Sequence, residues 1–162
     1  MKKSILTILA VFICMMSFAQ KDLQFLTKNI NKFNHVHASS YAAGYSLTYS
    51  YDYEIKDGVL KEVITYVKTQ QKVLLSVDLK DLIKIEKVTE EGKHESLLLT
   101  FKDNSVDYIN GNFQEKQNAI SIQFCTKTTQ NSSLKLKCEK AKHTLNTEFS
   151  VKTIQAFQGL IK

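Results

Sequence analysis

The sequence predicts an α+β, mainly β domain: an antiparallel meander that forms a bent sheet or open barrel, with a short N-terminal helix and a C-terminal helix packed on it. From Tyr45 to Ile55, apolar and polar residues alternate, which is typical of a half-buried strand. Further short strands follow, joined by short turns that favour antiparallel neighbours, because parallel strands need long crossovers. Both ends of the domain instead show helical spacing.

The best-defined element is a hairpin around Asp57-Gly58, a dipeptide typical of two-residue β-turns. Such a turn fixes the register, and the predicted cross-strand pairs are Ile55 with Leu60, Tyr51 with Ile64, Tyr49 with Tyr66, and Glu54 with Lys61. One face of the hairpin is then apolar, and the other carries an opposite-charge pair.

Later strands are predicted at Lys72–Val77, Ile83–Val88, Ser96–Phe101, Ala119–Phe124 and around Leu134 and Leu136. We expect residues 34–44 to form a loop and residues 90–94 to form a turn. Asp103-Asn104 is predicted to be a tight turn, setting Phe101 opposite Val106 and Leu99 opposite Tyr108. Ile83 and Ile85 are expected to share the apolar face of their strand.

Two helices are expected to complete the domain. The first covers residues 22–33, with Asp22 as N-cap and an apolar face of Leu23, Leu26, Ile30 and Phe33. The second follows Asn146 or Thr147 as N-cap, and its apolar face consists of Val151, Ile154, Phe157 and Ile161.

The first 19 residues have the layout of a secretory signal peptide. Lys2 and Lys3 precede a short apolar stretch, and the segment ends in Ser17-Phe18-Ala19. The apolar stretch is too short for a membrane span. We therefore expect cleavage after Ala19, one globular domain over residues 20–162 without a transmembrane segment, and a periplasmic or extracellular location.

Composition excludes several classes of function. All 22 basic residues are lysine, and they are scattered along the chain. Arginine makes the bidentate contacts to phosphate and guanine, so we expect no nucleic-acid partner. An exported chain works without the cytoplasmic pools of ATP and NAD(P)H, and we expect no cofactor.

Few residues form a catalytic or metal-binding pattern. His35-x-His37 lacks further ligands at metal-site spacing, and solvated loop histidines explain it better. No GxSxG motif and no pair of carboxylates in an acid–base context is present. We therefore assign no catalytic residue and no metal ligand.

The candidate ligand-binding residues are five tyrosines of the hairpin: Tyr45, Tyr49, Tyr51, Tyr53 and Tyr66. On one interpretation they form a wall for an amphiphile or glycan, with apolar rings and polar hydroxyl tips. On the other they are one face of the core, because tyrosine is common in strands. Both interpretations remain open at this point.

Cys125 and Cys138 are candidates for one disulfide, because an oxidising compartment favours the bond. Alternation argues against it: Cys125 follows the inward Phe124, whereas Cys138 has the parity of Leu134 and Leu136. Cysteines bridged directly across strands share a face, so the bond requires a bulge near residues 126–133.

The polar-flanked strand Asp78-Leu79-Lys80-Asp81-Leu82-Ile83-Lys84-Ile85, the tight hairpins and the final Ala156-Phe157-Gln158-Gly159-Leu160-Ile161 resemble pleckstrin-homology-like domains over residues 45–162. The Ser-Phe-Ala-Gln signal end is similar to signals of small secreted Bacteroidetes proteins of no assigned activity. The sequence thus favours a non-catalytic binding or interaction domain for an amphiphile, a glycan or an envelope protein. A small hydrolase with an unrecognised site and a structural or inhibitory partner of an envelope protein are the alternatives.

Overall fold

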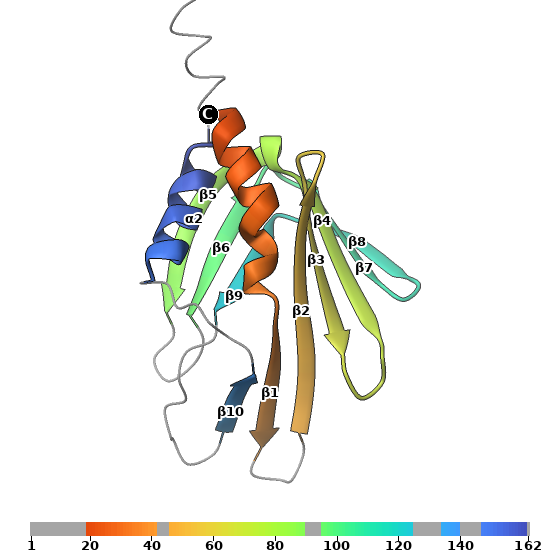
Figure 1. The fold of residues 1–162 in the computed structure, drawn as a ribbon. Helices are drawn as coiled ribbons and strands as arrows, with labels where there is room; N and C mark the ends of the chain where they lie inside the picture. The colour runs from red at the N-terminus through yellow and green to blue at the C-terminus, as the bar shows by residue number, and fades with distance from the viewer. Residues whose placement is uncertain (1–18, 42–45, 90–94, 125–133, 140–146, 162) are drawn as a thin grey trace, which may run out of the picture.

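A computed structural model describes residues 19–41, 46–89, 95–124, 134–139 and 147–161 of the chain. The architecture is mainly β, with two antiparallel sheets and helices that cover one of them (Figure 1). One sheet has seven strands in the order β10-β1-β2-β3-β4-β7-β8, and the other has three in the order β5-β6-β9. The prediction of a mainly β, antiparallel fold with two helices is confirmed. The strands divide between two sheets, which do not close into a barrel.

The strands are β1 (His35–Tyr41), β2 (Ser46–Lys56), β3 (Val59–Tyr66), β4 (Lys72–Asp78), β5 (Leu82–Thr89), β6 (Glu95–Phe101), β7 (Val106–Asn110), β8 (Phe113–Gln117), β9 (Ala119–Phe124) and β10 (Leu134–Glu139).

The β2–β3 hairpin has the predicted register. Cα partners are Ile55 with Leu60, Tyr51 with Ile64, Tyr49 with Tyr66, and Glu54 with Lys61. The backbone φ angles are 51° at Asp57 and 78° at Gly58. Two positive φ values in succession match a type I′ turn, whose twist agrees with that of the flanking strands.

We expect Gly58→Val to lower the free energy of unfolding by about 1–3 kcal/mol, because a β-branched residue resists positive φ. A Cβ atom at this position meets no atom within 4 Å, so backbone conformation alone sets the cost. Gly58→Asn is the matched control, since asparagine tolerates this conformation. Urea unfolding measures both variants, and equal losses would contradict the assignment of the cost to φ.

Two strands are missing from the sequence-based prediction. β1 occupies most of the predicted loop at residues 34–44, and its sequence lacks apolar alternation. It forms a strand because it pairs with β2 on one side and β10 on the other. β8 pairs with β7 across a turn in which Gly111 has a φ of 59°.

The predicted hairpin at Asp103-Asn104 is wrong. Leu99 pairs with Ile85 and Ile120 in the three-stranded sheet, whereas Tyr108 pairs with Leu75 in the seven-stranded sheet. The turn therefore carries the chain from one sheet to the other. Turn residues report a reversal of the chain but not which strands pair after it.

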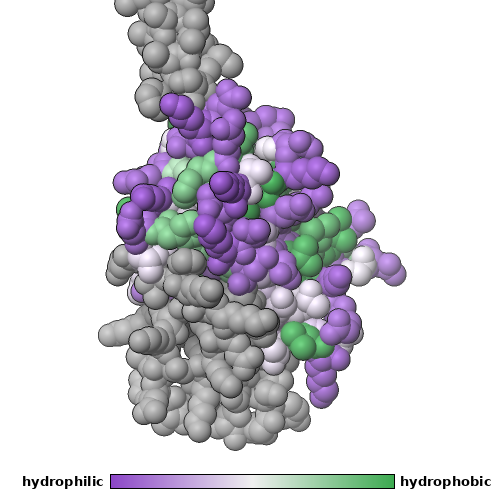
Figure 2. Space-filling view, viewed as in Figure 1, coloured by the Kyte–Doolittle hydropathy of each residue, from purple (hydrophilic) through white to green (hydrophobic). Residues whose placement is uncertain are grey.

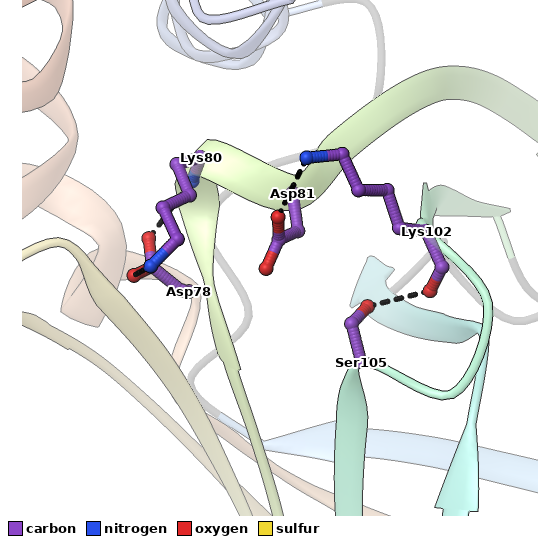
Figure 3. Close-up of polar contacts among 5 residues, drawn as sticks. All are labelled: Asp78, Lys80, Asp81, Lys102 and Ser105. Atoms are coloured by element: carbon purple, nitrogen blue, oxygen red, sulfur yellow. Dashed lines mark hydrogen bonds and ion pairs between the residues drawn. The ribbon is translucent and has the colours of Figure 1, made fainter.

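A second crossing between the sheets lies beside the first. The 3-10 helix η2 (Leu79–Asp81) connects β4 to β5, in place of the continuous strand predicted there. The Lys102 backbone N–H donates to the Asp81 carbonyl at 2.9 Å, and Lys102 Nζ lies 2.9 Å from Asp81 Oδ1 (Figure 3). Ser105 Oγ donates to the Lys102 carbonyl at 2.6 Å. These bonds fasten the two crossings to one another.

Ile83 does not share a face with Ile85 as predicted. It is 51% exposed, because the β5–β6 register shifts between Leu82 and Lys84. Ile83 is the extra residue of this irregularity, and Leu82 takes the inward position instead.

Helices cover the three-stranded sheet. Residues 19–29 are helical and continue into the 3-10 helix η1 (Ile30–Phe33), so Asp22 lies inside the helix and is not its N-cap. α2 (Glu148–Gln158) begins after Thr147, whose Oγ1 accepts the Ser150 N–H at 3.2 Å. Figure 1 shows the two helices side by side over β5, β6 and β9, with the N-terminal helix in orange-red and α2 in blue.

Aromatic rings join the helices to each other and to the sheet below. Phe149 of α2 lies 6.2 Å from Phe25 and 5.4 Å from Phe33, and Phe33 lies 5.0 Å from Phe124 of β9, measured between ring centroids. Val151 was predicted to face the core but is 37% exposed. Among the described residues, no helix has the length and apolar character needed to cross a membrane.

Candidate functional site

The tyrosines lie on the inner face of the seven-stranded sheet, which we define by its buried residues Tyr53, Ile55, Leu60, Val73, Leu75 and Val77. Tyr53 is only 2% exposed and belongs to the core, whereas Tyr49, Tyr51 and Tyr66 are half-buried. Tyr45 lies outside the described residues. We call Tyr49, Tyr51 and Tyr66 the tyrosine wall.

The rings of the tyrosine wall are inclined to one another. Ring centroids of Tyr49 and Tyr66 are 4.9 Å apart with an interplanar angle of 65°, and those of Tyr49 and Tyr51 are 6.4 Å apart at 43°. Tyr49 and Tyr66 are the cross-strand partners predicted from the turn. The alternation of β2 and the register of β3 together bring these rings into one cluster.

The hydroxyl group of Tyr53 links the two sheets. It accepts the Gln123 backbone N–H at 3.0 Å and lies 3.4 Å from the Ser121 carbonyl oxygen. Both residues belong to β9, which is an edge strand of the three-stranded sheet. Tyr53 therefore satisfies backbone groups on the edge of β9 that has no partner among the described strands.

Glu62 is the main residue missing from the sequence-based site. It is the Cα partner of Tyr53 on β2 and of Leu75 on β4, and its side chain is 3% exposed. Burial raises the pKa of Glu62 to about 7, although a hydrogen bond with the Tyr53 side chain favours the charged form. The hairpin register already placed Glu62 opposite Tyr53, so alternation was the signal that could have found it.

The electrostatics of the tyrosine wall reflect this buried carboxyl group. Burial raises the pKa of Tyr51 to about 12, and the charge of Glu62 adds to the effect, followed by Tyr49 and Tyr66. Burial also raises the pKa of Tyr53 well above its ordinary value, again with Glu62 as the next cause. Tyr51 and Tyr53 are thus held as neutral phenols beside a carboxyl group that titrates near neutral pH.

Among the residues whose side chains the structure describes, Glu62 forms no ion pair with a lysine. The described ion pairs are Lys80–Asp78, Lys84–Glu86, Lys102–Asp81, Lys116–Asp107 and Lys152–Glu148. All are partly exposed and lie elsewhere. Within the same ranges, no serine, cysteine or histidine side chain is hydrogen-bonded to Glu62, and no three His, Cys, Asp or Glu residues gather as a metal site.

Polar and aromatic residues continue the inner face toward β8. The Gln71 amide donates to Asn110 Oδ1 at 2.8 Å, and Asn110 Nδ2 lies 3.4 Å from the Tyr108 hydroxyl oxygen. The Tyr108 ring meets that of Phe113 edge-on at 6.3 Å, and Phe113 is 57% exposed. The sequence did not predict a role for these four residues, because neither β8 nor the pairing of β7 with β4 follows from a local pattern.

The side chains of both cysteines lie outside the part of the chain whose side chains are described. Cys138 lies in β10, with His37 of β1 as its Cα partner. Cys125 lies outside the described residues, and the part of the chain that is described contains no disulfide. The Cys125–Cys138 bond therefore stays a prediction.

No family model, curated protein or solved structure matches the chain. The inner face of the seven-stranded sheet combines a buried carboxyl group, three inclined tyrosine rings and two hydrogen-bonded amide side chains.

Proposed function

We propose that the protein is an exported, non-catalytic binding domain whose tyrosine wall binds a small amphiphile. The observation that carries this proposal is Glu62, a carboxyl group that is 3% exposed and has no described cation beside it. A buried ionisable group of this kind lowers stability, and an apolar residue would pack there at less cost. Residues that break the rules of core composition are concentrated at functional sites.

The chemistry of the wall suits a ligand with both apolar and polar parts. Tyrosine rings offer apolar contact area, and their hydroxyl groups offer hydrogen bonds at the rim. Ile64 lies beside Tyr51 on β3, and Gln71 and Asn110 supply amide groups nearby. A ligand-binding face of this type needs a few placed polar groups among mostly apolar ones.

The location and family resemblance belong to the same proposal. The signal-peptide layout of residues 1–19 supports export to the periplasm or beyond, and the Ser-Phe-Ala-Gln end supports a Bacteroidetes-like origin. Packing of α2 on the sheet that contains β5 supports the resemblance to pleckstrin-homology-like domains.

A second candidate is a protein-interaction role for the outer face of the seven-stranded sheet. Val63, Leu74 and Ile109 are adjacent in register on that face, and all three are half-buried. Figure 2 shows hydrophobic side chains gathered where β3, β4 and β7 lie. This apolar row favours a partner of an envelope protein over a small-molecule site.

Octyl glucoside binding distinguishes the two faces. The chain contains no tryptophan, and three of its seven tyrosines form the wall, so tyrosine fluorescence responds to a ligand that binds there. We expect saturable binding below the micelle-forming concentration, weakened about fivefold in Tyr66→Leu by loss of one ring contact. Tyr66→Phe keeps the ring and most of the affinity, and the outer-face control Leu74→Thr binds like the parent.

Two results would contradict the proposed function. Parental affinity in Tyr66→Leu would remove the tyrosine wall from the binding surface. A loss confined to Leu74→Thr would move the interaction to the outer face and favour the second candidate.

A further inference from the structure

We propose that the ligand carries an organic cation, which sits against the rings of Tyr51 and Tyr66 with Glu62 as its counter-ion. This inference rests on the proposed function, since it names the head group of the ligand bound by the tyrosine wall. It follows from the charge of the inner face and from the arrangement of its rings.

The first argument is the missing counter-charge. Glu62 lies between Tyr53 and Leu75 in register, and its other neighbours on the inner face of β3 are Leu60 and Ile64. The one polar side chain that lowers the pKa of Glu62 is the neutral phenol of Tyr53, its Cα partner on β2. Buried carboxylates in proteins are normally paired with a cation, and none of the described lysines fills that role. A cationic ligand would supply the missing partner.

The second argument is the ring arrangement. The face of a tyrosine ring carries negative electrostatic potential and attracts cations, most strongly where water is excluded. The wall sets three such rings at angles to one another, with Tyr66 4.9 Å from Tyr49 between centroids. Glu62 lies two residues from Ile64, the Cα partner of Tyr51, so its side chain is on the same face of the sheet as the Tyr51 ring. Carboxylate and ring faces thus attract the same sign of charge.

Other ligand classes fit this face less well. A hard metal ion needs several oxygen ligands, whereas Glu62 is the one buried acidic side chain of the described residues. An anionic head group would meet the Glu62 charge with no described cation beside it. A neutral glycan would use the amides of Gln71 and Asn110 but leave the carboxylate unpaired.

The inference also requires a pH dependence of binding. The phenols of Tyr51 and Tyr53 on β2 interact with Glu62, while β4 presents the apolar Leu75. The titratable residues of β1 in register with the wall are His35 and His37, the Cα partners of Tyr51 and Tyr49. Burial holds the pKa of Tyr51 and of Tyr53 above its ordinary value. The part of the pH dependence that disappears in Glu62→Gln therefore belongs to the Glu62 carboxyl group and not to the histidines of β1. A cation favours the ionised carboxylate, and affinity therefore falls as the pH is lowered.

The test compares octyltrimethylammonium with octyl glucoside, two amphiphiles with the same tail, by tyrosine fluorescence below their micelle-forming concentrations. At pH 8 we expect the cation to bind on the order of tenfold more tightly. The formal net charge of the chain is +6, so non-specific attraction does not produce this preference. Glu62→Gln should abolish the preference, while the exposed Glu54→Gln on β2 keeps it, and lowering the pH to 5.5 should reduce it in the parent.

The outcomes separate this inference from the proposed function. Equal affinity for both amphiphiles, lost together in Tyr66→Leu, would overturn the cation and leave the binding wall standing. A cation preference that survives in Glu62→Gln would overturn the role of Glu62 and with it the inference. Binding of neither amphiphile would overturn both.

Discussion

We expect Phe157→Ala to lower the free energy of unfolding by about 3–5 kcal/mol, the usual cost of removing a buried phenylalanine. Phe157 is 0% exposed on α2, and Ile154 and Ala156 of the same helix are also buried. Removal of the Phe157 ring leaves a cavity between α2 and the sheet that the helix covers. The apolar face of β5, β6 and β9 depends on this cover, so the loss acts on the whole domain.

Urea unfolding followed by tyrosine fluorescence measures this loss. Val151→Ala is the matched control, because Val151 lies on the same helix and is 37% exposed. We expect the control to change stability by less than about 1 kcal/mol. A similar small change in Phe157→Ala would mean that α2 is dispensable and not part of the core.

We expect Glu62→Gln to stabilise the protein by about 3 kcal/mol at pH 8 and to leave stability nearly unchanged at pH 4. The pKa of Glu62 rises from an ordinary value of 4.5 to about 7 in the folded protein. Each unit of this difference corresponds to about 1.4 kcal/mol. Glutamine keeps the shape and can still accept the Tyr53 O–H, but it carries no charge to bury.

The direction in which stability changes with pH follows from the uptake of a proton by Glu62 on folding. Between pH 4.5 and 7 the folded state holds a proton on Glu62 that the unfolded state has released. The contribution of Glu62 to the free energy of unfolding is therefore highest below pH 4.5. It decreases as the pH rises from 4.5 to 7 and is constant at higher pH. Lowering the pH therefore increases the stability that Glu62 contributes, whereas carboxylates that are paired in the folded state lose their contribution as the pH falls.

The measurement is the difference in unfolding free energy between parent and variant at several pH values, which cancels the titration of other groups. Glu54→Gln is the control, because Glu54 is exposed on the neighbouring strand and makes the same chemical change. A parent–variant difference that does not vary with pH would show that the Glu62 carboxyl group is not desolvated in solution.

The sequence alone determined the elements whose cause is local. The Asp57-Gly58 turn fixed the β2–β3 register, and alternation identified β4 and the inward Ile120, Ile122 and Phe124 of β9. Helical spacing located both helices, and Thr147, one of the two predicted N-caps, is the N-cap of α2. These features depend on backbone conformation and on the spacing of apolar residues within a short segment, and both can be predicted from the local sequence.

Pairing between distant strands was decided only by the tertiary structure. After the turn at Asn104, β7 pairs with β4 in the seven-stranded sheet and not with β6, the strand before the turn. β1 forms between β2 and β10 although its sequence has no apolar alternation. The site divides in the same way. Alternation placed the tyrosines on one face, whereas the burial of Glu62 depends on the packing of both sheets around Tyr53. Period and turn chemistry act over a few residues, but burial and desolvation depend on which faces meet.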